Sequence, residues 1–174
     1  HASTNDYDWL GHGVYFWEQN RERAERWAQE QQRRGKIDKP AVIGAVIDLG
    51  HCLNLTDSEY IDLLENEYKL LKAEMGAVGL DMPQNEGNTG DKLWRKLDCA
   101  VVEHLHSRLE WEYGREEDAL PPFDSARALF GEGKEIYPGA GFKQKTHIQI
   151  CVRNPNCIKG YFDPRKKKSK WPVP

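Results

Sequence analysis

The residues best suited to chemistry near the start of this chain form the segment Gly11-His12-Gly13-Val14-Tyr15-Phe16. Two glycines flank His12 and lead into a β-branched and aromatic run, which predicts a strand over residues 14–17. Glycines at such a place allow a sharp turn or a close approach of the backbone to a ligand. The tyrosine can present its flat face to an aromatic ring. The same pattern also fits a glycine-rich hairpin that feeds a buried strand, and the residues alone leave both interpretations open.

A second group of polar residues lies between Thr146 and Phe162. Polar and apolar residues alternate over 146–152, which predicts a strand with His147 and Gln149 on the same face. A turn over residues 154–156 and a second strand over 157–162 follow. His147 is expected either to touch a ligand or to lie at a sheet edge. Gln149 is either a binding residue or an ordinary polar residue of a half-buried strand.

The first segment resembles the second motif of ADP-ribosyltransferases of the poly(ADP-ribose) polymerase and diphtheria-toxin type. That family has Gly-x-Gly-[Ile/Val]-Tyr-Phe followed by a short helix, and residues 11–16 fit at every position. The resemblance implies that Tyr15 stacks on the nicotinamide of NAD, and that His12 and Gly13 lie at the cofactor, with the Gly13 backbone bonding the nicotinamide amide. Trp27, from the following helix, is the candidate for the second face of this aromatic sandwich, or else a core residue.

The second group resembles the third motif of that family, a strand with a catalytic Glu. The match puts Gln149 at the Glu position, which departs from the family pattern. Glutamine can bond a ribose hydroxyl through its amide oxygen, but it supplies no negative charge for the positive charge that develops at the anomeric carbon. The resemblance therefore implies transfer of a single ADP-ribose unit, or inactivity. Glu135 is a backup acidic residue, in a Gly-rich stretch (131–142) where the family has a loop that meets the acceptor.

The first motif of the family is a strand with His-Gly-[Ser/Thr], whose His holds the adenosine ribose. His1-Ala2-Ser3 imitates this motif. The family places the His a few tens of residues before the tyrosine, whereas Tyr15 follows His1 by 14 residues. We expect either that His1 is the ligand-binding residue or that the first strand is missing from this chain.

Other segments predict the elements that must position these residues. We expect a helix from Asn20 to about residue 34, a central strand over 41–49, and a helix that starts at residues 56–59. A further helix is expected from Asp91 to near residue 114, and a short helix around 125–130. Helices and strands mix without regular βαβ alternation, so the expected fold class is α+β.

The resemblance narrows this fold to a split, mostly antiparallel sheet with flanking helices and a central NAD cleft. We expect one such domain over residues 1–162 and a solvated basic tail over 163–174. With 174 residues the chain is long enough to bury a core. Its net charge of -3 does not by itself indicate nucleic-acid binding, although a local basic patch can suffice.

The four cysteines show no CxxC spacing and no Cys/His cluster, so no metal site is expected. Free buried thiols in a reducing compartment fit their apolar surroundings. No apolar run approaches the roughly 18–20 residues of a membrane span, and no signal peptide is visible. We therefore expect a cytoplasmic protein without a membrane partner.

The expected function is NAD-dependent mono-ADP-ribosyl transfer to a protein or nucleic-acid acceptor, with NAD as substrate. The resemblance to small bacterial stand-alone transferases implies a toxin or phage-defence effector, with a cognate antitoxin or regulatory protein as partner. The alternative is a catalytically inactive module that binds NAD or ADP-ribose. A third hypothesis is an interaction domain whose aromatic strand is only core.

Overall fold

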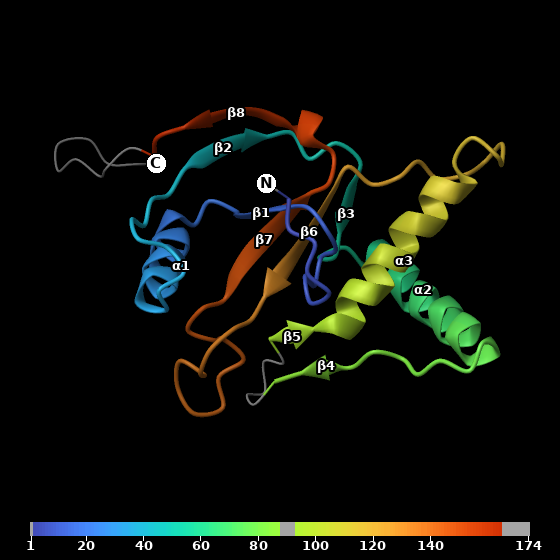
Figure 1. The fold of residues 1–174 in the computed structure, drawn as a ribbon, viewed down its shortest axis with the longest axis horizontal. Coiled ribbons are helices and arrows are strands. Elements are labelled where there is room, and N and C mark those ends of the chain that lie inside the picture. Colours follow the sequence, from blue (N-terminus) through green and yellow to red (C-terminus); the bar gives the residue numbers. More distant parts are fainter. Residues whose placement is uncertain (1, 88–92, 165–174) are drawn as a thin grey trace.

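A four-stranded sheet, flanked by three helices and two two-stranded sheets, dominates the computed structural model, which describes residues 2–87 and 93–164 (Figure 1). The strands are β1 (Val14–Trp17), β2 (Gly44–Ile47), β3 (Cys52–Asn54), β4 (Asn85–Glu86), β5 (Trp94–Arg95), β6 (Ser125–Phe130), β7 (His147–Val152) and β8 (Ile158–Phe162). The helices are α1 (Arg21–Arg33), α2 (Ser58–Ala77) and α3 (Lys96–Glu112), and a 3-10 turn spans Pro155–Cys157. This mixture confirms the α+β class.

The main sheet has the order β1-β7-β6-β3, with β7 antiparallel to both neighbours and β3 parallel to β6. Strands β2 and β8 form a separate antiparallel pair, and β4 and β5 another. Figure 1 shows β2 and β8 lying along one side of the main sheet, with α2 and α3 at the other end of the molecule from α1.

The core fills the space between the main sheet and α3. Val102, Leu105 and Leu109 lie on one stripe of α3 because their spacing follows the helical period. They pack against small side chains of the sheet, Ala126 and Ala128. The opposite face of the sheet carries Phe16, Ile150 and Val152, which pack on Ile47 of β2 and Ile158 of β8.

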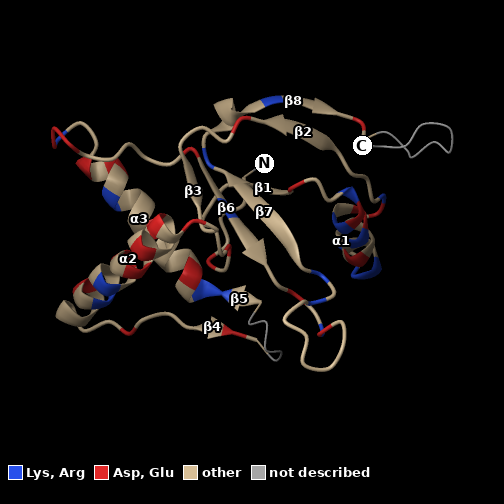
Figure 2. Ribbon diagram, turned by 180° about the vertical axis from the view of Figure 1, so that it is seen from behind, with Lys and Arg blue, Asp and Glu red and all other residues tan. Residues whose placement is uncertain are grey.

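Helix α1 begins as its sequence predicts: the Asn20 side chain accepts a hydrogen bond from the Arg23 N–H at 3.0 Å. Asp57 caps α2 in the same way through Glu59 N–H, at 3.1 Å. Helices α2 and α3 are joined by Glu67, a carboxylate only 1% exposed that accepts hydrogen bonds from His104 and Arg108. Figure 2 shows that charged residues concentrate on these helices, whereas β1 and β7 carry few.

Two predicted elements are wrong. Residues 125–130 form strand β6, not a short helix, because Ala126 and Ala128 are the small residues that the sheet needs beneath α3. The apolar run 41–49 contains only the four-residue strand β2, which pairs with β8 alone among the described residues. Val46 in it is 57% exposed, so this is not a central strand.

Other boundaries shift or agree. Helix α3 begins at Lys96 rather than at Asp91, and residue 91 lies outside the described part of the chain. The strands at 14–17, 147–152 and 158–162 are confirmed. Most of the expected basic tail, residues 165–174, lies outside the described residues.

The four cysteines are free thiols, and three of them (Cys99, Cys151 and Cys157) are buried, as expected. Among the helices of the described segments, none combines the length and apolar character that crossing a bilayer requires.

Candidate functional site

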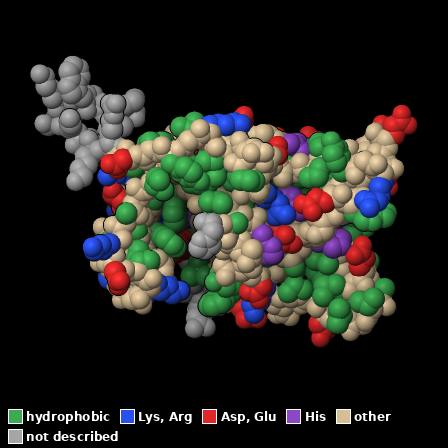
Figure 3. Space-filling view, turned by 45° about the horizontal axis from the view of Figure 1, so that its top comes forward, with side chains coloured by type: hydrophobic (Ala, Val, Ile, Leu, Met, Phe, Trp, Pro, Cys, Tyr) green, Lys and Arg blue, Asp and Glu red, His purple; other side chains and the backbone are tan. Residues whose placement is uncertain are grey.

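One face of the main sheet brings aromatic and polar side chains together. In the strand register, Trp17 of β1 lies opposite Gln149 of β7, and Phe130 of β6 lies opposite His147. Directly paired residues point to the same side of a sheet, so these four side chains share a face. The expectation that His147 and Gln149 lie on the same side of one strand is therefore confirmed. Figure 3 shows hydrophobic side chains grouped around a hollow in the surface of the molecule, left of centre.

The amide of Gln149 has a fixed orientation. Its Oε1 accepts a hydrogen bond from the indole Nε1 of Trp9 at 2.6 Å. Because an indole nitrogen can only donate, the amide oxygen must face Trp9 and the NH2 group must point away from it. Gln149 therefore offers the N–H donors of its NH2 group on the other side. The sequence had led us to expect that its amide oxygen would bond a ribose hydroxyl.

Trp9 connects Gln149 to a neighbouring cavity. Its ring lies 4.9 Å from Phe130, and the Arg95 guanidinium carbon lies 5.3 Å from the Trp9 ring and 4.8 Å from Phe130. These distances fit cation–π contacts. An adjoining cavity of about 350 Å³ is lined mostly by apolar residues of α2 and α3, including Leu64 and Val101.

Trp17 is the centre of an aromatic and basic cluster. Its ring centroid lies 5.4 Å from that of Trp27 and 6.3 Å from that of His147. The Arg23 guanidinium carbon lies 5.9 Å from the same ring. Trp27, which is 42% exposed, forms the outer part of this cluster. Trp27 thus lies at the predicted site, where it contacts Trp17. Trp17 was not among the residues expected at the site, although the two-residue period of a strand places it on the same face as Tyr15.

The carboxylate at this cluster is Glu132, in the loop between β6 and β7. It forms an ion pair with Arg23 at 3.0 Å and with Lys145 at 3.1 Å. The predicted backup residue, Glu135, is exposed and accepts a hydrogen bond from Gly139 N–H within its own loop, at 2.8 Å. Glu132 was missed, although its position directly after β6 places it beside the start of β7.

Tyr15 is tied into the loop that precedes its strand. Its hydroxyl donates to the Gly11 carbonyl at 2.8 Å and accepts from Leu10 N–H at 3.0 Å. Burial raises the pKa of this hydroxyl far above its ordinary value. In the register Tyr15 lies opposite Cys151, so the aromatic residue opposite Gln149 is Trp17.

Gly13 is required by the close approach of β7. A Cβ at this position would lie 2.6 Å from the Cys151 sulfur and 2.6 Å from the Val152 carbonyl oxygen. Both backbone groups of Gly13 pair with Ser3: its N–H donates at 3.1 Å, and its carbonyl accepts at 2.7 Å. The Gly13 backbone groups that were expected to bond nicotinamide are therefore already hydrogen-bonded to Ser3 in this conformation. His1 lies outside the described residues.

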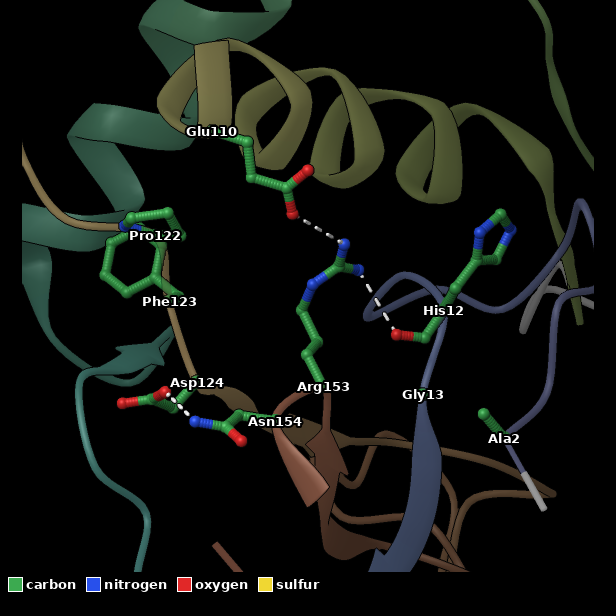
Figure 4. A pocket seen from close by; sticks show the side chains of 9 residues that line it. All are labelled: Ala2, His12, Gly13, Glu110, Pro122, Phe123, Asp124, Arg153 and Asn154. Atoms are coloured by element: carbon green, nitrogen blue, oxygen red, sulfur yellow. Dashed lines mark hydrogen bonds and ion pairs between the residues drawn. The ribbon is translucent and has the colours of Figure 1, made fainter. Parts of the chain in front are cut away.

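His12 faces α3 rather than Gln149. Its backbone N–H donates to Glu103 at 2.7 Å, and its Nδ1 lies 3.3 Å from the same carboxylate. It lines a cavity of about 380 Å³ into which Arg153 projects (Figure 4). Arg153 donates to the His12 carbonyl at 3.2 Å and lies 3.9 Å from Glu110. This cavity contains neither Gln149 nor Trp17, so the structure does not bring His12 to the predicted site.

Asp124 and Asn154 line the same cavity and bond to each other at 2.7 Å (Figure 4). This hydrogen bond is the main reason that the pKa of Asp124 is lowered. Within residues 2–87 and 93–164, no three His, Cys, Asp or Glu side chains gather as metal ligands would.

Comparisons with known proteins give one distant relative and no family. No protein-family model matches the chain, and no solved structure matches it. The chain is similar to the uncharacterized protein MJ0359 of Methanocaldococcus jannaschii, with 29% identity over 179 residues. The similarity covers 90% of this chain and 74% of the relative. The description of that relative names no activity.

Proposed function

We propose that this protein binds NAD on the face of Trp17 and Gln149 and transfers ADP-ribose to an acceptor. The observation that carries the proposal is the register of β1 and β7, which sets an aromatic ring opposite a fixed amide directly after the Gly-His-Gly loop. Such a pair suits a flat heterocycle joined to a ribose: the ring stacks on the indole, and the amide bonds a ribose oxygen.

The residues act mainly by positioning. Trp17 and Trp27 offer π-faces for nicotinamide, and the NH2 group of Gln149 donates to an oxygen of the adjacent ribose. The bond between nicotinamide and ribose breaks with its electron pair leaving on nicotinamide, and an acceptor nucleophile attacks the anomeric carbon and loses its proton. Gln149 brings no charge to the developing cation, which lowers the rate of transfer. The resemblance implies that a residue other than Glu at this position goes with transfer of a single unit.

Isothermal titration with NAD and chromatographic detection of released nicotinamide test this proposal. The wild-type protein is expected to bind and cleave NAD. Trp17→Ala should weaken binding roughly ten- to a hundredfold, because stacking of a base on an aromatic residue contributes about 1–3 kcal/mol. Trp111→Ala is the matched control, since Trp111 is 61% exposed near the end of α3. A wild-type protein that neither binds nor cleaves NAD contradicts the proposal.

The second candidate function is an inactive NAD or ADP-ribose-binding module, which the amide at position 149 favours. Binding of NAD without release of nicotinamide would support it. For the transferase, NAD labelled in its adenylate part identifies the acceptor: label that resists nuclease but not protease is on protein, and the reverse is nucleic acid. A toxin or phage-defence role with a cognate antitoxin belongs to the same proposal.

A further inference from the structure

Buried polar atoms without a hydrogen-bond partner gather around Trp17. They are Nε1 of Trp17, Nε and Nη1 of Arg23, and Nε2 of His147. Arg23 and His147 are only 7% and 4% exposed. These residues come from β1, α1 and β7 and meet at one place, as the distances to the Trp17 ring show. Native proteins rarely leave buried donors unsatisfied, so this cluster points to a bound group that supplies the missing partners.

The hydrogen-bonding capacity of the cluster is specific. Nδ1 of His147 faces the Lys145 carbonyl at 2.5 Å, and a carbonyl only accepts, so Nδ1 carries the proton. Nε2 of the neutral ring is then an acceptor. The free nitrogens of Arg23 and Trp17 can only donate. The cluster therefore sets donors beside one acceptor, which is the complement of a primary carboxamide.

The charge of the cluster is balanced. Arg23 and Lys145 pair with Glu132 at 3.0 and 3.1 Å, and Lys145 also pairs with Glu30 at 3.1 Å, so two cations face two carboxylates. Burial lowers the pKa of His147, which keeps its ring neutral near pH 7. A carboxylate or phosphate would bring a negative charge and only acceptor oxygens. Such an oxygen would be repelled by the lone pair of His147 Nε2, which is itself an acceptor. The rings of Trp17, Trp27 and Phe130 supply flat apolar walls, so the fitting ligand is an aromatic ring that carries a neutral amide.

We propose that Arg23 and His147 recognise the carboxamide of the nicotinamide ring that stacks on Trp17. Arg23 donates to its carbonyl oxygen, and Nε2 of His147 accepts from its NH2 group. This inference rests on the proposed function. In that proposal Gln149, opposite Trp17, bonds the ribose, so the aromatic ring bound at Trp17 is the nicotinamide joined to that ribose. These side chains take the role expected of the Gly13 backbone, which is bonded to Ser3. Entry of the ring requires Trp27 to move away from Trp17.

Titration of the protein with nicotinamide, nicotinic acid and 3-methylpyridine, followed by tryptophan fluorescence, tests the inference. Nicotinamide is expected to bind at least roughly tenfold more tightly than the other two. Arg23→Lys keeps a charge for Glu132 but removes the planar donors, and it should cost roughly tenfold in nicotinamide affinity. Arg26→Lys is the matched control on the same helix, since Arg26 pairs with Glu22 at the surface. His147→Phe keeps a flat ring but removes the acceptor, and it should abolish the preference over 3-methylpyridine.

Melting curves establish that the variants fold. Three outcomes overturn the inference. The protein binds nicotinamide and nicotinic acid equally well, it binds adenine more tightly than nicotinamide, or it binds none of them because the cluster holds only a buried water. NAD cleavage with an unchanged KM in Arg23→Lys and His147→Phe overturns it and leaves the transferase proposal standing. If nicotinamide binding depends on both residues but NAD is never cleaved, the carboxamide inference is supported and the transferase proposal is contradicted.

Discussion

At the scale of single residues, the hydrogen bond between Trp9 and Gln149 decides what position 149 can do. It holds the side chain in one orientation and leaves N–H donors for a ligand. A carboxylate at the same position could accept the same indole hydrogen bond and add a negative charge. Position 149 is therefore the place where a single substitution should change turnover most directly.

Gln149→Glu is expected to raise the rate of nicotinamide release from NAD roughly ten- to a hundredfold, because a fixed negative charge stabilises the positive charge of the transition state. The rate is measured at saturating NAD. Gln144→Glu, at an exposed position of the preceding loop, is the control. A folded Gln149→Glu protein with an unchanged or lower rate would show that this amide does not lie next to the reacting carbon.

Tyr15→Phe should lower the free energy of unfolding by about 1–3 kcal/mol. It leaves the Leu10 N–H without its partner, and it leaves the Gly11 carbonyl with only the weak bond from the Cys151 thiol at 3.5 Å. Urea denaturation measures the change. Tyr161→Phe, where the side chain is 58% exposed, should alter stability much less. Equal effects of the two substitutions would mean that the Tyr15 hydroxyl does not hold the loop.

At the scale of elements, the contact between α2 and α3 depends on one buried carboxylate. Glu67 accepts hydrogen bonds from Nη2 of Arg108 at 2.6 Å and from Nε of Arg108 at 3.0 and 3.2 Å. Its Oε1 also accepts from Nδ1 of His104 at 2.6 Å. These bonds to Glu67 are the main reason that the pKa of Arg108 is raised. Without Glu67, Arg108 keeps only its ion pair with Glu112 at 2.8 Å, and His104 keeps only its contact with Glu74 at 2.9 Å.

Glu67→Ala should therefore destabilise the protein by about 1–3 kcal/mol in urea denaturation, because the charge-assisted hydrogen bonds between the two helices are lost. Glu65, two residues away on α2, forms an exposed pair with Lys69 and provides the control. Glu65→Ala should leave the midpoint nearly unchanged. A small effect of Glu67→Ala would indicate that α2 and α3 are joined by their apolar contacts alone.

The sequence predicted the elements whose pattern is local, and missed those that depend on distant partners. The alternation in residues 147–152 and the Asn20 cap are visible in single segments, and both are confirmed. The stretch 125–130 has no clear period, and only its position between β7 and β3 makes it a strand. The same limit applies to the candidate site. Glu132 and Arg23 meet only after folding, so no spacing in the chain connects them.

At the scale of the whole molecule, acid should weaken the fold through His106. This residue is 1% exposed, packs against Phe123, and has a pKa lowered to about 3 by burial and by the nearby charge of Arg153. In the unfolded chain the pKa is about 6.5. Between these values the unfolded state binds the extra proton, so stability is present above about pH 6.5 and is lost as the pH falls.

The loss is expected to approach about 1.4 kcal/mol per pH unit below pH 6 from this residue alone. Urea denaturation at pH 7.5, 6 and 5 measures the slope. His106→Leu should remove this contribution and flatten the pH dependence. If the slope of the variant equals that of the wild type, other groups cause the acid sensitivity.

The buried thiol of Cys151 lies at the centre of the main sheet, opposite Tyr15 and Ala126. Burial raises its pKa to about 12, so a thiol reagent can modify it only when β1 or the Gly11 loop opens. The rate at which Cys151 is modified therefore measures how often the strands that carry Trp17 and Gln149 open transiently. A ligand that binds only the closed form lowers this modification rate in proportion to its occupancy. The molecule thus contains its own reporter for ligand screening that requires no knowledge of the acceptor.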